Sequence, residues 1–374
     1  MAIFFSSIVT IFLLLSVPVS AQVIKTSPVL ERRIERVLRE EAFRSGASGL
    51  AFGMVQNDRV LLECYAGYSD ISNESPLGPH TVFPWGSLSK PLTAICSLHL
   101  VDQGKLDLLK PISQERQNTY GGSVSVADIL LHRSGIGEYS DYPLLASFQK
   151  HGPLEWNKSE IWKTIFSDTK GMKPGERFRY SSPGYILLSL YLERIIELQF
   201  EQLLNSAVAK PLQLNSLRVG GVSEFDSMRF RLDKGHRVPV DVGDVGWRLG
   251  AGGAYSNLPD ALRFAGALIE GTLLSPRSAG ELFRRRFNLQ MEGETVGVTY
   301  GFIRLGVGDA ATILCKAQQP GCGALLVIYP HAQMASVIFS NTTPVDLEQI
   351  HSRVVRAAAS SDTNLTGKLS TEVD

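Results

Sequence analysis

The sequence lacks an excess of charge of either sign. Its 37 lysine and arginine residues balance 37 aspartate and glutamate residues, so the formal net charge at pH 7 is zero. No long block of basic residues occurs either. Because a nucleic-acid-binding protein needs a basic patch or stripe, the composition indicates no nucleic-acid partner. We expect small-molecule partners instead.

Cysteine and histidine are also scarce, with four and seven residues in the chain. Their spacing matches no zinc-binding pattern, so we predict no metal site. Cys64 and Cys96 lie in apolar runs, which favours core packing. Cys315 and Cys322 flank a short Pro-Gly turn, and the sequence leaves their pairing open. The glycine-rich stretch 250–253 follows no predicted strand, so we expect neither a dinucleotide-binding loop nor an organic cofactor.

Long apolar runs are absent except at the N-terminus. Residues Ile3–Val19 form an apolar segment that ends in Val19-Ser20-Ala21, a small-residue cleavage pattern. We therefore predict a signal peptide over residues 1–21 and export to the periplasm or the extracellular space. The basic residues that usually precede such a segment are missing, so an uncleaved N-terminal membrane anchor is the alternative. No later segment predicts a membrane span.

The chain does contain enough apolar sequence for a large core, with 44% hydrophobic residues in a length of 374. Ser27-Pro28 is typical of a helix start. Two apolar runs at residues 50–55 and 60–65 bracket Asn57-Asp58, which is a hairpin signal. Clear strand-like runs return in the last third, at Gly301–Val307, Ala311–Lys316, Ala324–Tyr329 and Ala335–Ser340.

Between these strand-forming ends the patterns are mainly helical, and Thr343-Pro344 is predicted to start a last helix. Strands at both ends imply one antiparallel sheet built from the two chain ends, with flanking helices and a large helical insertion, an α/β fold of the α+β type. We assign residues 22–359 to this domain, with a helical lobe at about 87–287 inserted in the sheet lobe. The polar residues 360–374 are predicted to be a disordered tail. A site is expected between the lobes.

Ser87 and Lys90 form the pattern Ser-x-x-Lys at the expected start of a helix that ends near Gly104. Residues three apart share one helix face, with Cβ atoms about 5–6 Å apart, so Lys90 can reach the Ser87 hydroxyl. A serine nucleophile needs such a base because its hydroxyl is weakly nucleophilic. Taken alone, the pattern is much more often that of a capped helix with a solvated lysine, since serine is a common N-cap.

Further motifs follow Ser-x-x-Lys along the chain: Gly104-Lys105-Leu106, Leu130-Leu131-His132-Arg133-Ser134-Gly135, Pro174-Gly175 leading to Tyr180-Ser181-Ser182, Gly252-Gly253-Ala254-Tyr255-Ser256, and Pro320-Gly321. Together and in this order they resemble the serine β-lactamase and penicillin-binding family of the class C type. That family includes D-aminopeptidases, D-alanyl-D-alanine carboxypeptidases and esterases. The resemblance, from about Leu50 to Asn341, implies a β-lactamase/transpeptidase-like fold and hydrolysis of a small ester, amide or peptide.

The resemblance also implies roles for single residues. Ser87 matches the acyl-accepting nucleophile and Lys90 its proton-transfer partner. Tyr180 matches the tyrosine of the family's Tyr-x-Asn motif, which helps move the proton to the leaving group. The oxyanion hole would consist of the backbone N–H of Ser87 and a backbone N–H near Gln318 or Gln319, and one such donor is worth about 3 kcal/mol.

Two motifs depart from the family. Ser182 stands where the family has Asn, and because it precedes Pro183 it is alternatively only a helix cap. The family's Lys/His-Thr/Ser-Gly motif aligns with Cys315-Lys316-Ala317, or with Lys316-Ala317-Gln318 after a one-residue shift. Neither register has the hydroxyl and the glycine that contact a substrate carboxylate in the family. We assign substrate binding to Ser182, Lys316 and Gln318.

These observations predict an exported serine hydrolase that forms an acyl-Ser87 intermediate from a small ester or amide, without a metal or cofactor. A degenerate family member that binds an acyl or peptidoglycan-like ligand without turnover is the first alternative, and an interaction scaffold is the second. If neither Lys316 nor another basic residue such as Arg248 reaches the pocket, a substrate carboxylate has no partner there. Neutral esters are then expected to be better substrates than penicillins or D-Ala-D-Ala peptides.

Overall fold

The computed structural model describes residues 28–112, 123–153, 155–166, 172–241, 243–291, 293–306 and 311–360. The predicted signal peptide at residues 1–21 and the predicted tail, apart from Ser360, lie outside this range. Within it, no helix combines the length and the hydropathy needed to cross a membrane.

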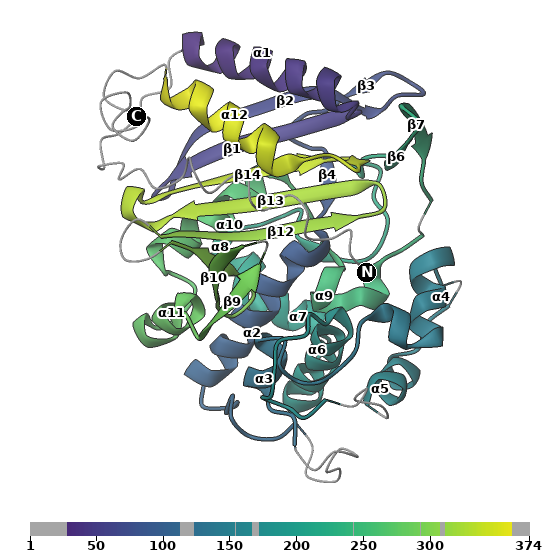
Figure 1. The fold of residues 1–374 in the computed structure, drawn as a ribbon, viewed down its shortest axis with the longest axis vertical. Coiled ribbons are helices and arrows are strands. Elements are labelled where there is room, and N and C mark those ends of the chain that lie inside the picture. Colours follow the sequence, from purple (N-terminus) through teal and green to yellow (C-terminus); the bar gives the residue numbers. More distant parts are fainter. Residues whose placement is uncertain are drawn as a thin grey trace.

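A nine-stranded sheet organises the described residues and joins strands from the N-terminal part of the chain with strands from its C-terminal part (Figure 1). Its strand order is β3-β2-β1-β14-β13-β12-β11-β10-β9. These strands are β1 (Gly49–Gln56), β2 (Arg59–Asp70), β3 (Ser75–Pro76), β9 (Phe287–Met291), β10 (Glu294–Val298), β11 (Ile303–Leu305), β12 (Thr312–Gln319), β13 (Cys322–Tyr329) and β14 (Met334–Ser340). Strand β1 pairs antiparallel with β2 through the predicted hairpin and with β14, where Leu50 lies opposite Ser340. The predicted fold class is confirmed.

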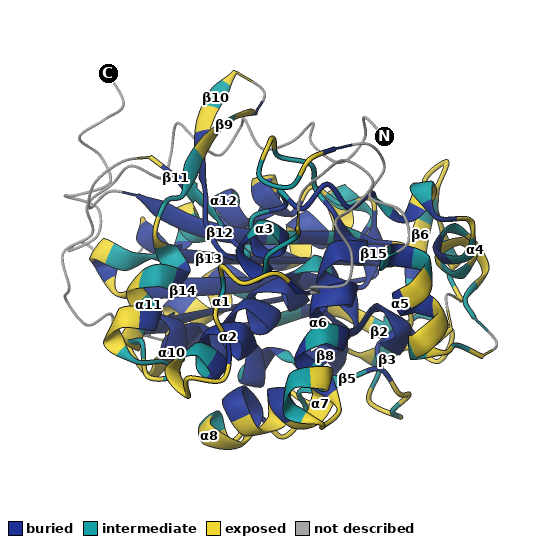
Figure 2. Ribbon diagram, turned by 90° about the horizontal axis from the view of Figure 1, so that it is seen from below, coloured by how far each residue is buried: buried dark blue, intermediate teal, exposed yellow. Residues whose placement is uncertain are grey.

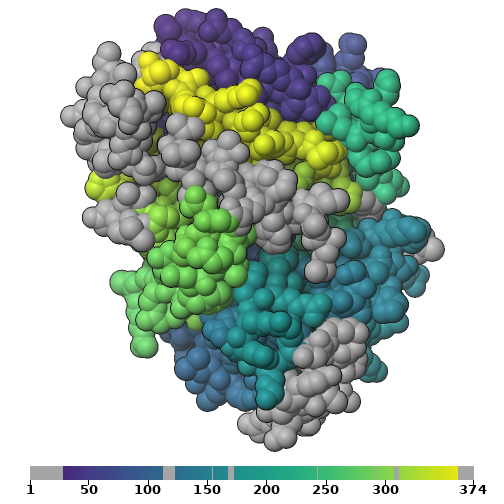
Figure 3. Space-filling model, viewed as in Figure 1, coloured from purple at the N-terminus to yellow at the C-terminus, as the bar shows by residue number. Residues whose placement is uncertain are grey.

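Helices α1 (Pro28–Ser45) and α12 (Leu347–Ala359) cover one face of the sheet and pack against each other. Figure 3 shows the two helices side by side at the top of the molecule. Helix α1 buries Leu30, Ile34 and Leu38, whose spacing of four residues forms one apolar stripe. This stripe joins strand residues such as Leu314 and Leu325 in a core on the α1/α12 face.

The other face of the sheet is covered by α10 (Leu258–Glu270), which packs on β14 and β1, and by a mainly helical lobe. The lobe contains α2 (Ser89–Asp102), α3 (Val126–Leu130), α4 (Pro143–His151), α5 (Lys158–Phe166), α6 (Ser182–Ile196), α7 (Phe200–Leu204), α8 (Lys210–Leu212) and α9 (Leu249–Gly252). Helix α11 (Pro276–Phe283) packs against α2. Figure 2 shows the interior strands as buried and exposed residues on α7, α8, α10 and α11.

Two small sheets add strands that the sequence analysis did not predict. Their orders are β15-β6-β7 and β4-β8-β5. The strands are β4 (Val82–Pro84), β5 (Arg218–Val219), β6 (Phe230–Asp233), β7 (His236–Pro239), β8 (Ala254–Asn257) and β15 (Thr342–Thr343). Four of these strands, β5 to β8, fall in the stretch that the sequence predicts to be mainly helical.

Aromatic side chains fill the space between the sheet and α10. Phe83 of β4 stacks on Phe339 of β14, with ring centroids 5.1 Å apart and an interplanar angle of 6°. Trp85 lies against Phe264 of α10 at 5.5 Å between centroids. All four side chains are buried. Their packing fixes the chain on both sides of Pro84, just before Ser87.

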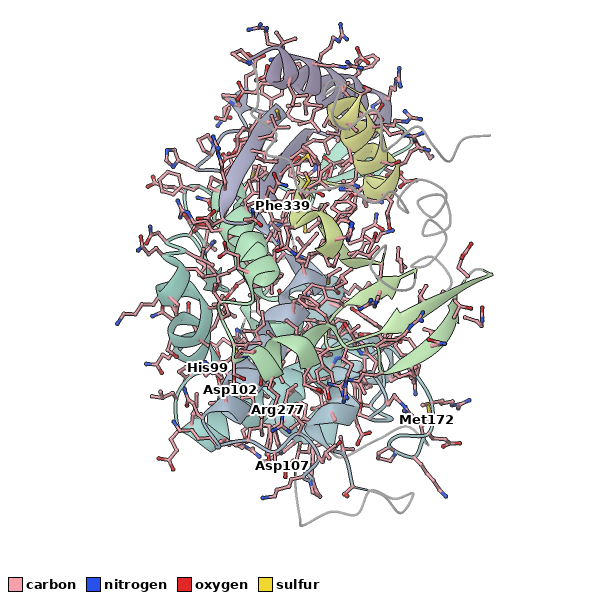
Figure 4. All side chains as sticks on the ribbon, turned by 90° about the vertical axis from the view of Figure 1, so that its left-hand side faces the viewer. His99, Asp102, Asp107, Met172, Arg277 and Phe339 are labelled. Carbon is pink, nitrogen blue, oxygen red and sulfur yellow. The ribbon has the colours of Figure 1, made fainter. Side chains whose placement is uncertain are left out.

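Helix α2 leads from the sheet into the helical lobe. Figure 4 shows Phe339 in the upper half of the molecule and His99 and Asp102, at the C-terminal end of α2, in the lower half. The carboxylate of Asp102 accepts hydrogen bonds of 2.6 Å from Ser275 and Ser278, which fasten this end of α2 to α11. The start of α2 therefore lies at the boundary between the lobes.

The C-terminal helix begins later than the sequence predicts. Thr342 and Thr343 form β15 and pair with β6 instead of starting the helix. Asp346 caps α12 by accepting a hydrogen bond of 2.9 Å from the N–H of Gln349. The Thr343 hydroxyl instead accepts a hydrogen bond of 2.8 Å from the N–H of Gly321, so Asp346 supplies the acceptor that a free N–H of the first helical turn requires.

The four cysteines are free thiols in the structure. In the pairing of β12 with β13, Cys322 lies opposite Gln319, whereas Cys315 lies opposite Leu326. The sequence leaves open whether Cys315 and Cys322 form a disulfide. They do not pair in the structure, because the strand register separates them.

Candidate active site

Ser87 lies in a single 3-10 turn, Gly86–Leu88, that leads directly into α2. Gly86 has a φ of 52°, which residues with a Cβ rarely adopt. A Cβ on Gly86 would also lie 3.2 Å from the Cβ of Ala317 in β12. Glycine therefore lets this turn pack closely on β12, and Ser87 sits at the lobe boundary.

Two polar groups contact the hydroxyl of Ser87. Its Oγ lies 2.8 Å from the hydroxyl of Tyr180 and accepts a hydrogen bond of 3.1 Å from Nζ of Lys90. Lys90 belongs to the first turn of α2, and Tyr180 to the loop before α6. The structure thus brings together the three residues that the sequence analysis assigns to catalysis, at distances suited to proton transfer.

Lys90 is almost completely buried, with 2% of its surface exposed. Burial lowers the pKa of Lys90 to about 8, and the nearby Glu138 carboxylate opposes this shift. Nζ also donates a hydrogen bond of 2.9 Å to the carbonyl oxygen of Ala251. With a pKa near 8, roughly a tenth of the amine is neutral at pH 7, and this fraction can accept a proton from Ser87.

The glycine-rich segment Gly250–Gly253 supports Lys90. Thr93 of α2 donates a hydrogen bond of 2.9 Å to the carbonyl oxygen of Gly250, and the N–H of Ala254 donates one of 3.1 Å to Ser89. A Cβ on Gly250 would come within 1.9 Å of Thr93 Oγ1, so this approach requires glycine. The close packing of α9 on α2 holds the Ala251 carbonyl beside Nζ.

His132 supports the ring of Tyr180. The two rings stack with centroids 4.4 Å apart, and Nδ1 of His132 accepts a hydrogen bond of 3.1 Å from the N–H of Ser181. Burial, and then the charge of Lys90, lower the pKa of His132, so its ring is neutral. Burial also raises the pKa of Tyr180, so its phenol keeps its proton. Among Lys90, His132 and Tyr180, Lys90 is therefore the residue whose protonation changes near neutral pH.

Ser181, and not Ser182, is the cap of α6. Its side chain accepts a hydrogen bond of 2.9 Å from the N–H of Gly184. The Ser182 hydroxyl instead accepts a hydrogen bond of 3.4 Å from Nζ of Lys90. The alternative in which Ser182 serves only as a helix cap is therefore wrong. Ser182 lies beside the lysine, where the resemblance implies an Asn side chain.

The buried carboxylate of Glu138 completes the surroundings of Lys90. Its oxygens accept hydrogen bonds of 3.0 Å from the backbone N–H groups of Ser182 and Tyr139. Burial raises the pKa of Glu138, while these hydrogen bonds and the Lys90 charge oppose the rise. The sequence analysis missed Glu138 and His132 as site residues. The available signal was their position in, or just after, the 130–135 motif.

Lys316 and Gln318 point away from this site. Side chains alternate along a strand, and the β12 residues in the core of the helical-lobe side are Ile313, Cys315 and Ala317. Lys316 lies on the opposite face and forms an ion pair with Glu348 of α12. Gln318 is two residues further along and faces the same way. The assignment of the Lys316 and Gln318 side chains to substrate binding is therefore wrong, because strand alternation turns them to the other face of the sheet. A backbone N–H near Gln318 stays a predicted oxyanion donor.

Backbone groups of β12 remain available near Ser87. Strand β11 pairs with β12 only at Thr312–Leu314, so the outer edge of residues 315–319 has no strand partner in the described ranges. Sγ of Cys315 contacts the carbonyl oxygen of Ser87 at 3.7 Å. An unpaired strand edge here suits a backbone oxyanion donor. The described residues contain no group of three or more His, Cys, Asp or Glu side chains that could hold a metal ion.

Comparison with known proteins gives a family match over most of the chain, since the family model described as Beta-lactamase matches residues 33–360. The putative penicillin-binding protein PbpX of Bacillus subtilis (strain 168) is 25% identical over 272 residues, which are 69% of this chain and 66% of PbpX. Protein flp of Staphylococcus aureus (strain MW2) is 25% identical over 191 residues, which are 49% of this chain. This match spans only 37% of the length of flp.

Solved structures share the fold at low sequence identity. The octameric penicillin-binding protein homologue from Pyrococcus abyssi superposes with a TM-score of 0.76 at 19% identity, over 91% of this chain and 79% of that chain. The D-amino acid amidase from Ochrobactrum anthropi SV3, complexed with D-phenylalanine, gives a TM-score of 0.76 at 19% identity, over 89% of this chain and 100% of that chain. With the match over residues 33–360, this chain belongs to the beta-lactamase family and has its serine hydrolase fold.

Proposed function

We propose that this protein is an exported serine hydrolase that forms an acyl intermediate on Ser87 from a small ester or amide, as an esterase or a D-peptidase does. The observation that carries the proposal is the position of Ser87 Oγ, 3.1 Å from Lys90 Nζ and 2.8 Å from the Tyr180 hydroxyl. Residues 1–21, whose sequence is typical of a signal peptide, support export.

In acylation, the neutral amine of Lys90 accepts the proton of Ser87 while Oγ attacks the substrate carbonyl carbon. Backbone N–H groups of Ser87 and of the unpaired edge of β12 stabilise the negative charge that develops on the carbonyl oxygen. Tyr180 donates its proton to the leaving group and regains a proton from Lys90. Water then attacks the acyl-Ser87 ester, releasing the acid and restoring the hydroxyl.

The name of one structural relative, a D-amino acid amidase, supports an amide substrate, and other relatives are named as penicillin-binding proteins. A second candidate is a degenerate member that binds an acyl ligand without turnover. It is favoured by Cys315, which stands where the family has a lysine or histidine. Burial raises the pKa of the Cys315 thiol to about 12, so this side chain is neutral and cannot replace that cation.

Intact mass spectrometry after incubation with a fluorophosphonate, together with turnover of p-nitrophenyl acetate, tests the proposal. We expect one adduct that maps to Ser87, and steady-state release of p-nitrophenol. Ser87→Ala should lose both, whereas Ser97→Ala, which changes another serine of α2, should retain both. An adduct without turnover would support the binding protein, and an unreactive Ser87 would overturn the acyl-serine mechanism.

A further inference from the structure

The loop before α6 is fastened, on both sides of Tyr180, to the segment that contains His132 and Glu138. On the C-terminal side, the N–H of Ser182 donates a hydrogen bond of 3.0 Å to Oε2 of Glu138. On the N-terminal side, the N–H of Arg179 donates one of 2.7 Å to the carbonyl oxygen of His132. Tyr180 therefore lies between two anchored neighbours, and the direction of its side chain depends on both anchors.

An ion pair strengthens the anchor on the N-terminal side. Nη2 of Arg179 donates a hydrogen bond of 2.6 Å to Oδ2 of Asp141. The two side chains are 28% and 26% exposed, so water screens this pair less than it screens a fully exposed ion pair. Oδ2 of Asp141 also accepts a hydrogen bond of 2.7 Å from the N–H of Glu138. One short turn thus holds Arg179 through Asp141 and Ser182 through Glu138.

Gly137 allows Asp141 to fold back over this turn. A Cβ on Gly137 would lie 2.4 Å from Oδ2 of Asp141, so the approach requires glycine. The carbonyl oxygen of Gly137 also accepts a hydrogen bond of 2.7 Å from Oγ of Ser181, the residue after Tyr180. The turn is therefore packed around the Asp141 carboxylate, which it presents to Arg179.

The chemistry assigned to Tyr180 depends on its exact position. Burial raises the pKa of Tyr180, so its phenol is a weak acid. A weak acid gives little help to a leaving group that is stable as an anion, such as p-nitrophenolate, and more help to a basic alkoxide or amine. Proton transfer also requires the two atoms to lie within hydrogen-bond reach, and a misplacement of about 1 Å can cost about 10²-fold in rate.

We propose that the ion pair of Arg179 with Asp141 positions the Tyr180 hydroxyl to protonate the leaving group, an inference that rests on the proposed serine hydrolase function. Arg179 and Asp141 are positioning residues, and Tyr180 transfers the proton. As the C–O or C–N bond of the tetrahedral intermediate breaks, its electron pair stays on the leaving atom and takes the proton of Tyr180. Tyr180 then regains a proton from the ammonium group of Lys90. The ion pair therefore matters for alkyl esters and amides, and little for activated esters.

Two acetate esters separate this role from a general effect on the fold. Both p-nitrophenyl acetate and benzyl acetate form acetyl-Ser87, but only the benzyl alkoxide needs a proton in order to leave. In Arg179→Met, we expect kcat/KM for benzyl acetate to fall about tenfold or more, and that for p-nitrophenyl acetate to fall less than about twofold. Asp141→Asn should give the same pattern. The double variant should be no worse than either single variant, because the two residues act as one pair.

Three further variants or outcomes decide the matter. Arg231→Met breaks a more exposed ion pair, with Asp233 of β6, and should change neither value. Arg179→Lys keeps the cation and should recover part of the loss for benzyl acetate. If Arg179→Met does not fold, Asp141→Asn provides the result, since an Asn side chain can still accept a hydrogen bond from the N–H of Glu138.

An equal fall for the two esters in Arg179→Met, or an unchanged ratio between them in Asp141→Asn, would overturn the inference. The inference would also be overturned if the unaltered protein hydrolysed p-nitrophenyl acetate and left benzyl acetate intact, because Tyr180 would then protonate no alkoxide. If the unaltered protein hydrolysed neither ester, the proposed serine hydrolase function itself would be overturned.

Discussion

The hydroxyl of Tyr180 lies 2.8 Å from Oγ of Ser87, while the ring of the same tyrosine stacks on His132 at 4.4 Å between centroids. The hydroxyl and the ring therefore have separate contacts. Because the stacked ring holds Tyr180 in place, the hydroxyl can be removed without removing the packing that positions the loop before α6.

Tyr180→Phe should lower kcat for an ester by about 10²- to 10⁴-fold, the usual contribution of a positioned proton donor. The melting temperature should change little, because the stack on His132 remains. Steady-state kinetics and thermal unfolding measure the two effects. Full activity in Tyr180→Phe would show that the leaving group receives its proton elsewhere.

The rate of acylation should depend on the protonation of Lys90. Burial lowers the pKa of Lys90 to about 8, and the neutral amine is the form that accepts a proton. The value of kcat/KM for a neutral ester should therefore rise with pH and reach half its plateau near pH 8. Lys90→Arg keeps a cation but supplies no base, and it should lose activity at every pH. A profile that is flat from pH 6 to pH 9 would exclude Lys90 as the base.

Glu138 should help to set the pH at which kcat/KM rises. Its carboxylate raises the pKa of Lys90 against the effect of burial, so Glu138→Gln should move the rise in kcat/KM to lower pH. The amide oxygen of Gln can still accept a hydrogen bond from Ser182. Glu160→Gln, on the exposed side of α5, serves as the matched control. An unmoved profile with a lower plateau would indicate a structural role alone.

Residues with strong local signals were predictable from the sequence. Two signals were sufficient to predict one sheet built from the N-terminal and C-terminal parts of the chain: the hairpin at Asn57-Asp58 and the return of strand patterns after residue 300. The spacing of Ser87 and Lys90 within one helical turn was sufficient for their contact. Tyr180 lies 93 residues from Ser87. Its position beside Ser87 was predicted from the order of the family motifs, because no local spacing rule connects the two residues.

Other features depend on the tertiary structure. Whether Lys316 or Cys315 faces the site is set by the register of β12, which a shift of one residue reverses. Ser181 and Ser182 are both acceptable caps, and only the path of the loop determines which one bonds to Gly184. The burial of Glu138 and Arg248 results from packing between segments far apart in sequence, so neither residue type nor spacing indicates it.

The ion pair of Lys316 with Glu348 should contribute to stability and not to substrate binding. Glu348 is 2% exposed, so Lys316→Met would leave an unpaired buried carboxylate and should cost about 3 kcal/mol of unfolding free energy. Adding Glu348→Gln should recover most of this loss. Urea unfolding of the single and double variants measures the coupling. A raised KM for the ester in correctly folded Lys316→Met would return Lys316 to the substrate site.

Acid should destabilise the protein through His351, which lies buried between α12 and β14 with Nε2 2.6 Å from Oγ of Ser336. Burial lowers the pKa of His351 to about 4, whereas an unfolded histidine titrates near 6.5. Between these values the unfolded chain binds more protons, so stability falls as the pH falls. The loss should reach roughly 3 kcal/mol at pH 4.

His351→Gln removes this titration. We would measure the unfolding free energy of this variant and of the unaltered protein in urea from pH 7 to pH 4. The difference between the two free energies should change by about 3 kcal/mol over this range. Parallel curves for the two proteins would show that His351 is charged or accessible in the folded state.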